Sequence, residues 1–286
     1  MKKRWARRHI IEAVFKVLMV ISFALVAGSL ALILWTIISK GLPAMNWAMI
    51  TQTSNGGYYL GKTGGILNAI LGSLYMAGGG TVLALLTGLP IALYLETYLD
   101  NQAWGRYVRL ALDVLWWIPS IVYGAFGFIV MLALGLRASM LGGIIVLALL
   151  ELPILTRAMD EIIRLMPAEL EQAALALGST RLEVAVRVVT RQMLPGIVTA
   201  ILLAFGRGIG DAASVLFTAG YTDRIPTSLL QPVASLPLAV YFQLSMPYPE
   251  VQKRAYAAAL VLTLIVLAVS LGSRWLAGRL NKNVIR

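Results

Sequence analysis

Long runs of apolar residues, separated by short polar stretches, dominate the pattern of this chain. A transmembrane helix needs about 20 predominantly apolar residues. The pattern predicts six membrane-spanning helices, over residues 17–38, 66–95, 108–134, 141–155, 195–219 and 256–276. Gly78, Gly79, Gly80 and Pro90 interrupt the second of these segments, and Pro119 lies inside the third.

The first apolar run has a second interpretation as a secretory signal peptide, because it follows a basic tail. A signal peptide has an apolar core of roughly 7–15 residues and a cleavage site with small residues. The run over residues 17–38 is longer than such a core. We therefore expect an uncleaved membrane anchor.

The composition supports a membrane protein and excludes several other classes. Hydrophobic residues make up 59% of the 286 residues, charged residues make up 13%, and the mean hydropathy is +0.81. Soluble domains contain roughly 45–50% apolar and about 25% charged residues, and disordered chains have the opposite bias. The chain has no cysteine and one histidine, His9 in the basic tail. We therefore expect no metal site, no cofactor and no thiol or histidine catalysis.

The excess of basic residues indicates an orientation in the membrane. The net charge is +11, which in a soluble protein would suggest a nucleic-acid partner. If the N-terminus lies inside and the spans alternate, 17 of the 24 Lys and Arg residues fall in cytoplasmic segments. Basic residues concentrate in cytoplasmic loops of membrane proteins. We therefore expect both termini in the cytoplasm, membrane lipid as the surroundings, and no nucleic-acid partner.

The loop over residues 156–193 is too long for a tight turn and has a helical pattern. Pro167 suits the start of a helix, because a proline lacks the N–H that the first turn leaves unpaired. Gly178 follows a run of helix-forming residues and suits a left-handed C-cap. Thr180 and Glu183 have the spacing of a capping box, which predicts a second helix.

The first of these two helices allows two interpretations. Its small side chains would let the backbone of another protein approach closely, which favours a docking helix for a cytoplasmic partner. A helix that lies on the membrane surface without a partner has the same pattern. The pattern itself does not separate the two.

A resemblance to a known family favours docking. The sequence Gln172-Ala173-Ala174-Leu175-Ala176-Leu177-Gly178 resembles the EAA loop of bacterial ABC importer permeases, with Gln172 where that loop usually has Glu. In that family the loop is the coupling helix that docks in a cleft of the ATPase subunit. The resemblance implies that the residues of this chain that couple to the ATPase are Glu171, Gln172, Ala173, Ala174 and Gly178.

The fifth span carries two charged residues, Arg207 and Asp211, one helical turn apart. If the helix continues through them, both lie on one polar face with Ser214. An ionisable group deep in a bilayer costs roughly 2.5–3.5 kcal/mol and usually serves a pathway or a partner. Arg207 suits contact with an oxyanion or the ordering of a gate, with Asp211 adjusting it, because a guanidinium bonds two oxygens at once. The alternative is an ion pair whose only role is to neutralise both charges.

A second resemblance surrounds this pair. Residues 206–219 are similar to the Ala-Arg-x-x-Gly-Glu-Thr-Ala-Pro-Leu-Leu-Phe-Thr-Ala stretch of the PstA-type permeases of phosphate ABC importers, with Asp211 in place of Glu. It implies an all-α fold of the ABC importer type I permease class with six transmembrane helices. The partners it implies are two cytoplasmic ATPase subunits, a second permease subunit of the PstC type, and a periplasmic phosphate-binding protein. The substrate it implies is phosphate or a similar oxyanion, and the location is the bacterial inner membrane.

Two other functions have some support in the sequence. Gly208-Ile209-Gly210-Asp211 matches the Gly-x-Gly-Asp signature of intramembrane aspartyl proteases, which need a second Asp at the same depth. Asp113 and Asp160 are the candidates, and both are expected near cytoplasmic ends of spans. A secondary transporter would show inverted repeats or two broken helices, and no repeat of the halves is evident.

The chain contains no Gly-x4-Gly-Lys-Ser/Thr phosphate loop, so we expect ATP hydrolysis on a separate subunit and no enzyme activity here.

We expect residues 1–286 to form one transmembrane permease domain. Within it, residues 156–193 form the cytoplasmic coupling loop. Residues 221–253 form a periplasmic connection, either placed to meet a binding protein or a plain linker. Glu151 has two interpretations: it is a gate or pathway residue, or, because we expect it near the cytoplasmic end of the fourth span, snorkelling or pairing with Arg157 explains it.

Overall fold

The structure is a computed structural model that describes residues 2–55, 63–100 and 102–280. The long helices are α1 (Lys2–Gly41), α3 (Leu67–Leu99), α4 (Ala103–Trp117), α5 (Ser120–Ala133), α6 (Met140–Ile163), α10 (Leu194–Ile209) and α12 (Pro249–Leu280). The short elements are η1 (Leu42–Ala44), α2 (Trp47–Thr51), β1 (Ser54–Asn55), β2 (Thr63–Gly64), α7 (Ala168–Ala176), α8 (Arg181–Glu183), η2 (Val184–Val189), α9 (Thr190–Gln192) and α11 (Leu236–Leu244). β1 and β2 pair antiparallel, Ser54 with Gly64.

Four helices of the described residues are long and apolar enough to cross a membrane, namely α1, α3, α6 and α12. Two bent helix pairs raise the number to six if each pair is one span. In the first pair α4 and α5 meet at 97°, and in the second the segment Arg181–Gln192 meets α10 at 74°. The expectation of an all-helical membrane fold is confirmed.

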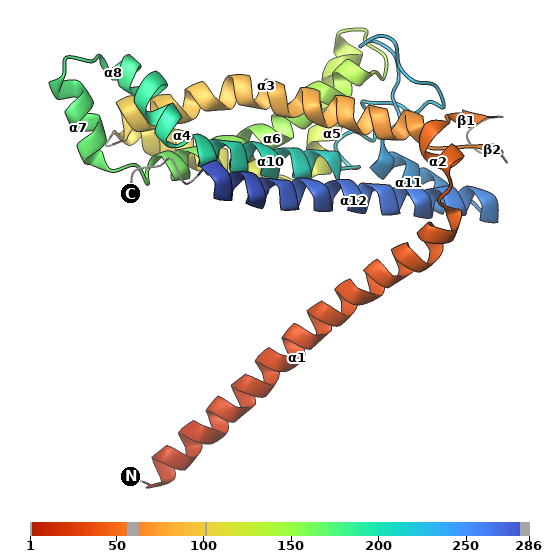
Figure 1. Cartoon of the computed structure of the whole chain (residues 1–286), viewed down its shortest axis with the longest axis horizontal. Coiled ribbons are helices and arrows are strands. Elements are labelled where there is room, and N and C mark those ends of the chain that lie inside the picture. Colours follow the sequence, from red (N-terminus) through yellow and green to blue (C-terminus); the bar gives the residue numbers. More distant parts are fainter. Residues whose placement is uncertain (1, 56–62, 101, 281–286) are drawn as a thin grey trace.

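The helices run between two ends of the molecule (Figure 1). The end with α7 and α8 also carries the C-terminal end of α12 and faces the same way as the N-terminal end of α1. The opposite end carries α2, the β1–β2 pair and α11. α1 leaves the other helices obliquely and joins them only near its own C-terminal end, where Gly41 packs on Tyr256 and Leu260 of α12.

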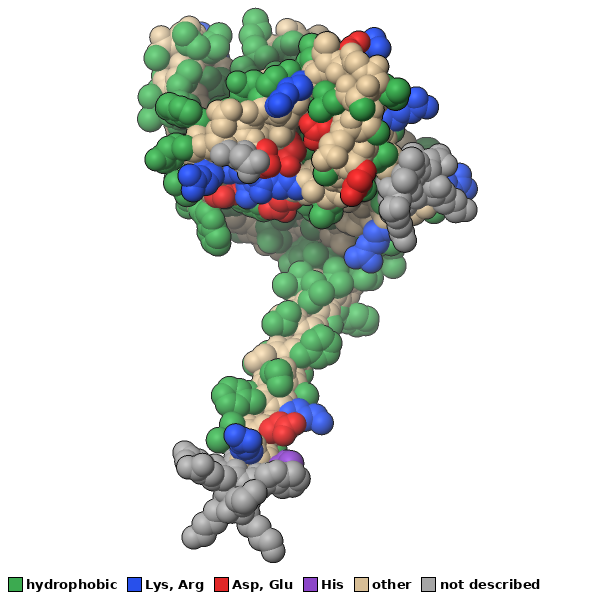
Figure 2. Space-filling view, turned by 90° about the vertical axis from the view of Figure 1, so that its left-hand side faces the viewer, with side chains coloured by type: hydrophobic (Ala, Val, Ile, Leu, Met, Phe, Trp, Pro, Cys, Tyr) green, Lys and Arg blue, Asp and Glu red, His purple; other side chains and the backbone are tan. Residues whose placement is uncertain are grey.

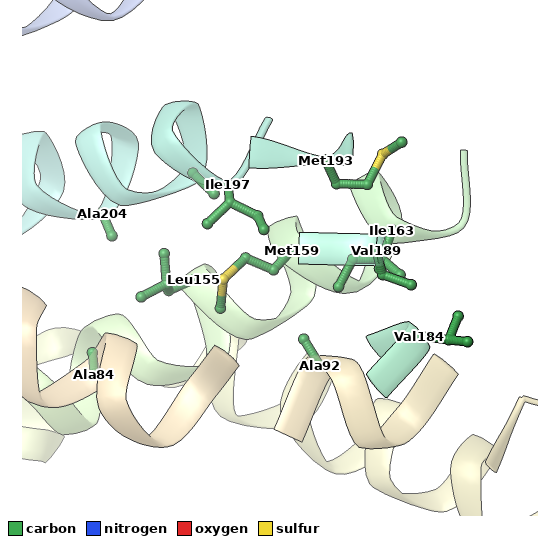
Figure 3. Packing of buried hydrophobic residues seen from close by; sticks show 11 residues of the cluster. Ala84, Ala92, Leu155, Met159, Ile163, Val184, Val189, Met193, Ile197 and Ala204 are labelled. Atoms are coloured by element: carbon green, nitrogen blue, oxygen red, sulfur yellow. The ribbon is translucent and has the colours of Figure 1, made fainter. Parts of the chain in front are cut away.

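The core lies where α3, α6 and α10 pack together (Figure 3). Leu155 and Met159 of α6 contribute the large side chains, and Ala84 of α3 and Ala204 of α10 supply small ones. Small side chains let membrane helices approach closely, and this close packing is a main source of attraction between helices in lipid. The core therefore fixes the position of α10 relative to α3 and α6.

α3 is one continuous helix, so the prediction that glycines and Pro90 interrupt it is wrong. A Cβ at Gly80 would lie 2.9 Å from the Cβ of Leu147, and a Cβ at Gly79 would touch Ile144. These glycines let α6 pack closely, and that packing offsets their low helix propensity. Pro119, in contrast, does end a helix, because Ile118 before it is extended with ψ of 127°.

The prediction of a helix over residues 195–219 is also wrong, because α10 ends at Ile209. The remaining residues up to Ala219 form successive turns. Gly206, Gly208 and Gly210 lie at this end, and each glycine lowers helix stability by about 1 kcal/mol relative to alanine. The chain therefore leaves the helix before Asp211.

Candidate functional site

The loop between α6 and α10 has the local structure that its sequence predicts. Gly178 is left-handed, with φ of +87°, and follows Leu177, the C-cap residue of α7. Thr180 and Glu183 form the expected capping box: Thr180 Oγ1 accepts the N–H of Glu183 at 3.3 Å, and Glu183 Oε2 accepts the N–H of Thr180 at 3.0 Å. The turn between α7 and α8 is thus fixed by its own backbone and side chains.

The predicted coupling residues divide between two faces of α7. Gln172 and Ala173 are exposed, and Gly178 at the end of the helix is exposed as well. Ala174 is half-buried and packs against the α3–α6–α10 core. Glu171 points the same way and lines a cavity of about 220 Å³ together with Glu96 and Arg164. A partner that docks on α7 would therefore meet Gln172 and Ala173.

A cluster of ion pairs lies at the same end, beneath this loop. Asp160 of α6 is completely buried and binds Arg109 of α4, with Oδ2 3.0 Å from Nε and Oδ1 3.0 Å from Nη2. Arg157 Nη1 is 2.7 Å from Asp160 Oδ2, and its Nε is 2.6 Å from Asp113 Oδ1. Glu96 Oε2 of α3 accepts a hydrogen bond from Arg109 Nη2 at 3.0 Å. The cluster ties α3, α4 and α6 together.

A space-filling view of this end shows basic and acidic side chains next to one another (Figure 2). The cluster was not predicted from the sequence, although Arg157, Asp160 and Arg164 have the i, i+3 and i, i+4 spacings that bring charges together on a helix. Arg109 and Glu96 come from other helices, and no local spacing identifies them.

The charged pair that the sequence singled out lies at the end of α10. Arg207 Nη2 is 3.7 Å from Asp211 Oδ1, so the two side chains form an ion pair even though Asp211 lies beyond the helix. The Arg207 side chain is 52% exposed, whereas the Asp211 side chain is 5% exposed. The guanidinium therefore keeps an open side while its carboxylate partner is enclosed.

Asp211 and Ser214 are joined by the turn that follows α10. Asp211 Oδ2 accepts the N–H of Ser214 at 2.8 Å. Ser214 is completely buried, and its backbone packs against Gly124 of α5, where a Cβ would lie 2.6 Å from the Ser214 carbonyl oxygen. The structure thus brings Arg207, Asp211 and Ser214 together, with Arg207 as the member that reaches the surface.

The segment around Asp211 borders an apolar groove. Gly210 and Ala212 line a cavity of about 560 Å³ together with Ile37 of α1 and residues of α11 and α12. Among the described residues no group of three His, Cys, Asp or Glu side chains could hold a metal ion. The charged group that this region offers to a ligand is the Arg207 guanidinium.

Glu151 lies elsewhere than the sequence predicts. α6 runs to Ile163, so Glu151 is near the middle of the helix and completely buried. Its Oε2 accepts a hydrogen bond from Thr81 Oγ1 at 2.7 Å, and Arg157 bonds to Asp113 and Asp160 instead. The expected pairing of Glu151 with Arg157 is therefore wrong.

The geometry does not favour an aspartyl protease. Asp113 and Asp160, the two candidate partners of Asp211, are both bound by Arg157 at the α7 end of the molecule. Asp211 is bound by Arg207 and by the Ser214 N–H. A protease dyad needs two carboxylates that share one proton, and these three carboxylates are occupied separately.

Comparison with known proteins decides the family. The model of the family described as "Binding-protein-dependent transport system inner membrane component" matches residues 84–286. The chain belongs to this family of importer permeases. The match covers the α7 loop, the whole ion-pair cluster and the end of α10.

Individual relatives agree with this assignment. The chain is 37% identical over 244 residues to the phosphate transport system permease protein PstA of Xylella fastidiosa, covering 84% of this chain and 83% of that protein. It is 34% identical over 275 residues to PstA 1 of Mycobacterium tuberculosis, covering 93% and 87%. A solved structure of the MetNI methionine ABC transporter in an inward-facing conformation matches 75% of this chain and 95% of that chain, with a TM-score of 0.61 and 16% identity. This last similarity concerns the fold.

Membership fixes the general role of this importer permease. It is a multi-pass component of the inner membrane and not the ATPase. ABC permeases of this kind work with an ATPase and with a substrate-binding protein, so partners of both types are expected for this one.

Proposed function

We propose that this permease carries phosphate, or a similar oxyanion, from the periplasm to the cytoplasm as part of an ATP-driven importer. The observation that carries the proposal is the 37% identity to a phosphate permease over most of both chains. Arg207 supports it independently. A guanidinium with 52% exposure at the end of a membrane helix offers charge-assisted hydrogen bonds to an anion.

The assembly contains two ATPase subunits, a second permease of the PstC type and a periplasmic phosphate-binding protein. The binding protein delivers the anion to the outer end of the molecule, to which the connection over residues 221–253 belongs. The ATPases bind the coupling loop over residues 156–193 through Gln172 and Ala173, and Gly178 fixes the turn that follows. Glu171 and Ala174 hold α7 to the bundle rather than contacting the ATPase.

Closure of the ATPases moves α7, and the movement passes to α10 through the core that both contact. Met193 and Ile197 at the start of α10 belong to the same core as Val184 and Val189 of η2. A rigid displacement of the loop therefore shifts α10 and, at its far end, Arg207. Asp211 and Ser214 are the other pathway residues: Asp211 pairs with Arg207, and the Ser214 N–H holds the Asp211 carboxylate in place.

Uptake of ³²P-labelled inorganic phosphate by the complete complex in proteoliposomes tests the proposal. We expect uptake that depends on ATP and on the binding protein. Arg207→Ala lowers uptake by about ten- to a hundredfold, because a hydrogen bond to a charged group contributes about 1.5–3 kcal/mol, while Arg207→Lys keeps part of it. Arg106→Ala, which removes an exposed arginine of α4, is the matched control and keeps normal uptake.

Three results would contradict parts of the proposal. Uptake of sulfate in place of phosphate by the wild-type complex contradicts the substrate. Unchanged phosphate uptake by an assembled Arg207→Ala complex contradicts the role of Arg207 and supports the simple ion pair. Uptake driven by an ion gradient in vesicles without the ATPase would instead indicate a secondary transporter.

A further inference from the structure

Glu151 occupies a position that neither the ion-pair cluster nor the proposed pathway explains. It lies at the junction of α3, α6 and α10, where it is completely buried. Thr81 of α3, itself 5% exposed, donates a hydrogen bond of 2.7 Å to Oε2. The other oxygen, Oε1, has no hydrogen-bond partner among the described residues. A buried carboxyl group with one neutral donor is costly, so its retention needs a reason.

The unpaired oxygen lies directly against Gly208 of α10. A Cβ added at Gly208 would be 1.8 Å from Glu151 Oε1 and 2.9 Å from its Cδ. The main chain of α10 therefore approaches the carboxyl group as closely as only glycine permits. Thr81 holds the carboxyl group from the other side, so the Glu151 side chain fills the space between α3 and Gly208.

Gly208 in turn connects the two members of the charged pair. It directly follows Arg207, and its carbonyl oxygen accepts the N–H of Asp211 at 3.1 Å and the N–H of Gly210. The turn that places Asp211 beside Arg207 thus begins at Gly208. Whatever fixes Gly208 also fixes the direction in which Arg207 leaves the helix.

We propose that Glu151 is a positioning residue for Arg207: its carboxyl group, held by Thr81, supports Gly208 and so sets the orientation of the Arg207–Asp211 turn. Glu151 acts through Gly208 and does not contact the anion. The inference rests on the proposed function for its effect on transport, but the contact between Glu151 and Gly208 does not depend on the identity of the substrate.

Four variants in the complete complex test the proposal, with uptake of ³²P-phosphate per ATP hydrolysed as the first measurement. Glu151→Gln keeps the shape and an acceptor for Thr81, and it retains most of the uptake. Glu151→Ala and Gly208→Ala each lower uptake per ATP by about tenfold or more, because a displacement of about 1 Å in a reactive geometry costs that much. In the double variant Glu151→Ala/Gly208→Ala the added methyl group enters the vacated space, and uptake rises above that of Gly208→Ala.

Gly78→Ala is the matched control for the glycine substitution, because a Cβ at Gly78 meets nothing within 4 Å. It keeps normal uptake. Thr81→Ser retains the hydrogen bond to Glu151, whereas Thr81→Val removes it and lowers uptake per ATP. Gel filtration of each complex separates these effects from loss of assembly.

A second measurement reports the position of the turn without any substrate. The chain has no cysteine, so Gly210→Cys provides one thiol next to the turn. Its rate of reaction with a maleimide changes several-fold when Glu151→Ala or Gly208→Ala is added, and it stays unchanged with Glu151→Gln.

The outcomes distinguish the two proposals. Normal uptake and normal labelling with Glu151→Ala overturn the inference, as does a double variant no better than Gly208→Ala. Changed labelling together with no phosphate uptake by the wild-type complex supports the inference and rejects phosphate as the substrate.

Discussion

Asp160 is the residue on which the ion-pair cluster depends. It is completely buried and accepts hydrogen bonds from Arg109 and Arg157, which come from different helices. Asp113 also binds Arg157, but its side chain is 42% exposed. Removing one partner of a buried pair leaves an uncompensated charge, whereas an exposed pair contributes little. The two carboxylates therefore differ in importance although they share an arginine.

We predict that Asp160→Asn destabilises the folded permease by about 3–5 kcal/mol, because Arg109 and Arg157 lose their shared anion. Asp113→Asn is the control, with a cost below about 1 kcal/mol. The midpoint of thermal unfolding of the purified permease in detergent measures both effects. Equal midpoints for the two variants would contradict the assignment of Asp160 as the centre of the cluster.

The sequence correctly predicted the conformation of residues whose structure depends on near neighbours in the chain. Gly178, Thr180 and Glu183 have the conformations that their types and spacing imply. Glu151 was misplaced because its partners, Thr81 and Gly208, are far away in the sequence. The partners of a buried carboxyl group come from the helices that surround it, and a single sequence does not show which helices those are.

At the scale of elements, α7 has one face against the bundle and one face open. Ala173 is exposed, whereas Ala174 packs against the α3–α6–α10 core. A run of small residues gives no indication of which of its members faces outward. The structure assigns Gln172 and Ala173 to the side that a partner can reach.

We predict that Ala173→Trp prevents the ATPase from binding, since a large side chain keeps the partner backbone from approaching α7. The permease itself stays folded because position 173 is exposed. Ala103→Trp, an equally large substitution at an exposed position of α4, is the control and leaves binding intact. Co-purification of the ATPase with each variant is the measurement. Normal recovery of the ATPase with Ala173→Trp would show that this face is not the docking surface.

The helices were easier to predict than their ends. The apolar runs located the long helices, because the bilayer imposes a minimum length on each, except that the single span predicted over residues 108–134 is two helices, α4 and α5, which meet at 97°. Their ends depend on packing: α3 continues past its glycines because α6 covers them, and α6 continues to Ile163 because Arg109 neutralises Asp160. α10 ends early because Asp211 binds the Ser214 N–H and so stabilises a turn.

At the scale of the whole molecule, the N-terminal end of α1, the C-terminal end of α12 and α7 face one way, and the β1–β2 pair and α11 face the other (Figure 1). The distribution of Lys and Arg residues assigns the first of these sides to the cytoplasm. Leu165, in the loop before α7, and Thr227, between α10 and α11, are exposed at opposite ends.

We predict that a membrane-impermeant maleimide added to intact cells with a permeabilised outer membrane labels Thr227→Cys and not Leu165→Cys. The reason is that the inner membrane separates the reagent from the cytoplasmic loop. Both variants carry a single thiol, since the natural chain has none. Labelling of Leu165→Cys after the inner membrane is opened is the control. The reverse pattern would invert the orientation and place the coupling loop away from any cytoplasmic ATPase.

The isolation of α1 has a consequence for how the protein is made. No residue in the apolar window of α1 is buried by the rest of the chain, so its helix is sustained by its own hydrogen bonds and by lipid. It precedes the bundle helices in the sequence and emerges from the ribosome before them. α1 is therefore able to enter the bilayer alone and to tether the nascent chain. α3, α6 and α10 pack around one shared core, so they depend on one another and must wait until Ile209 has been synthesised.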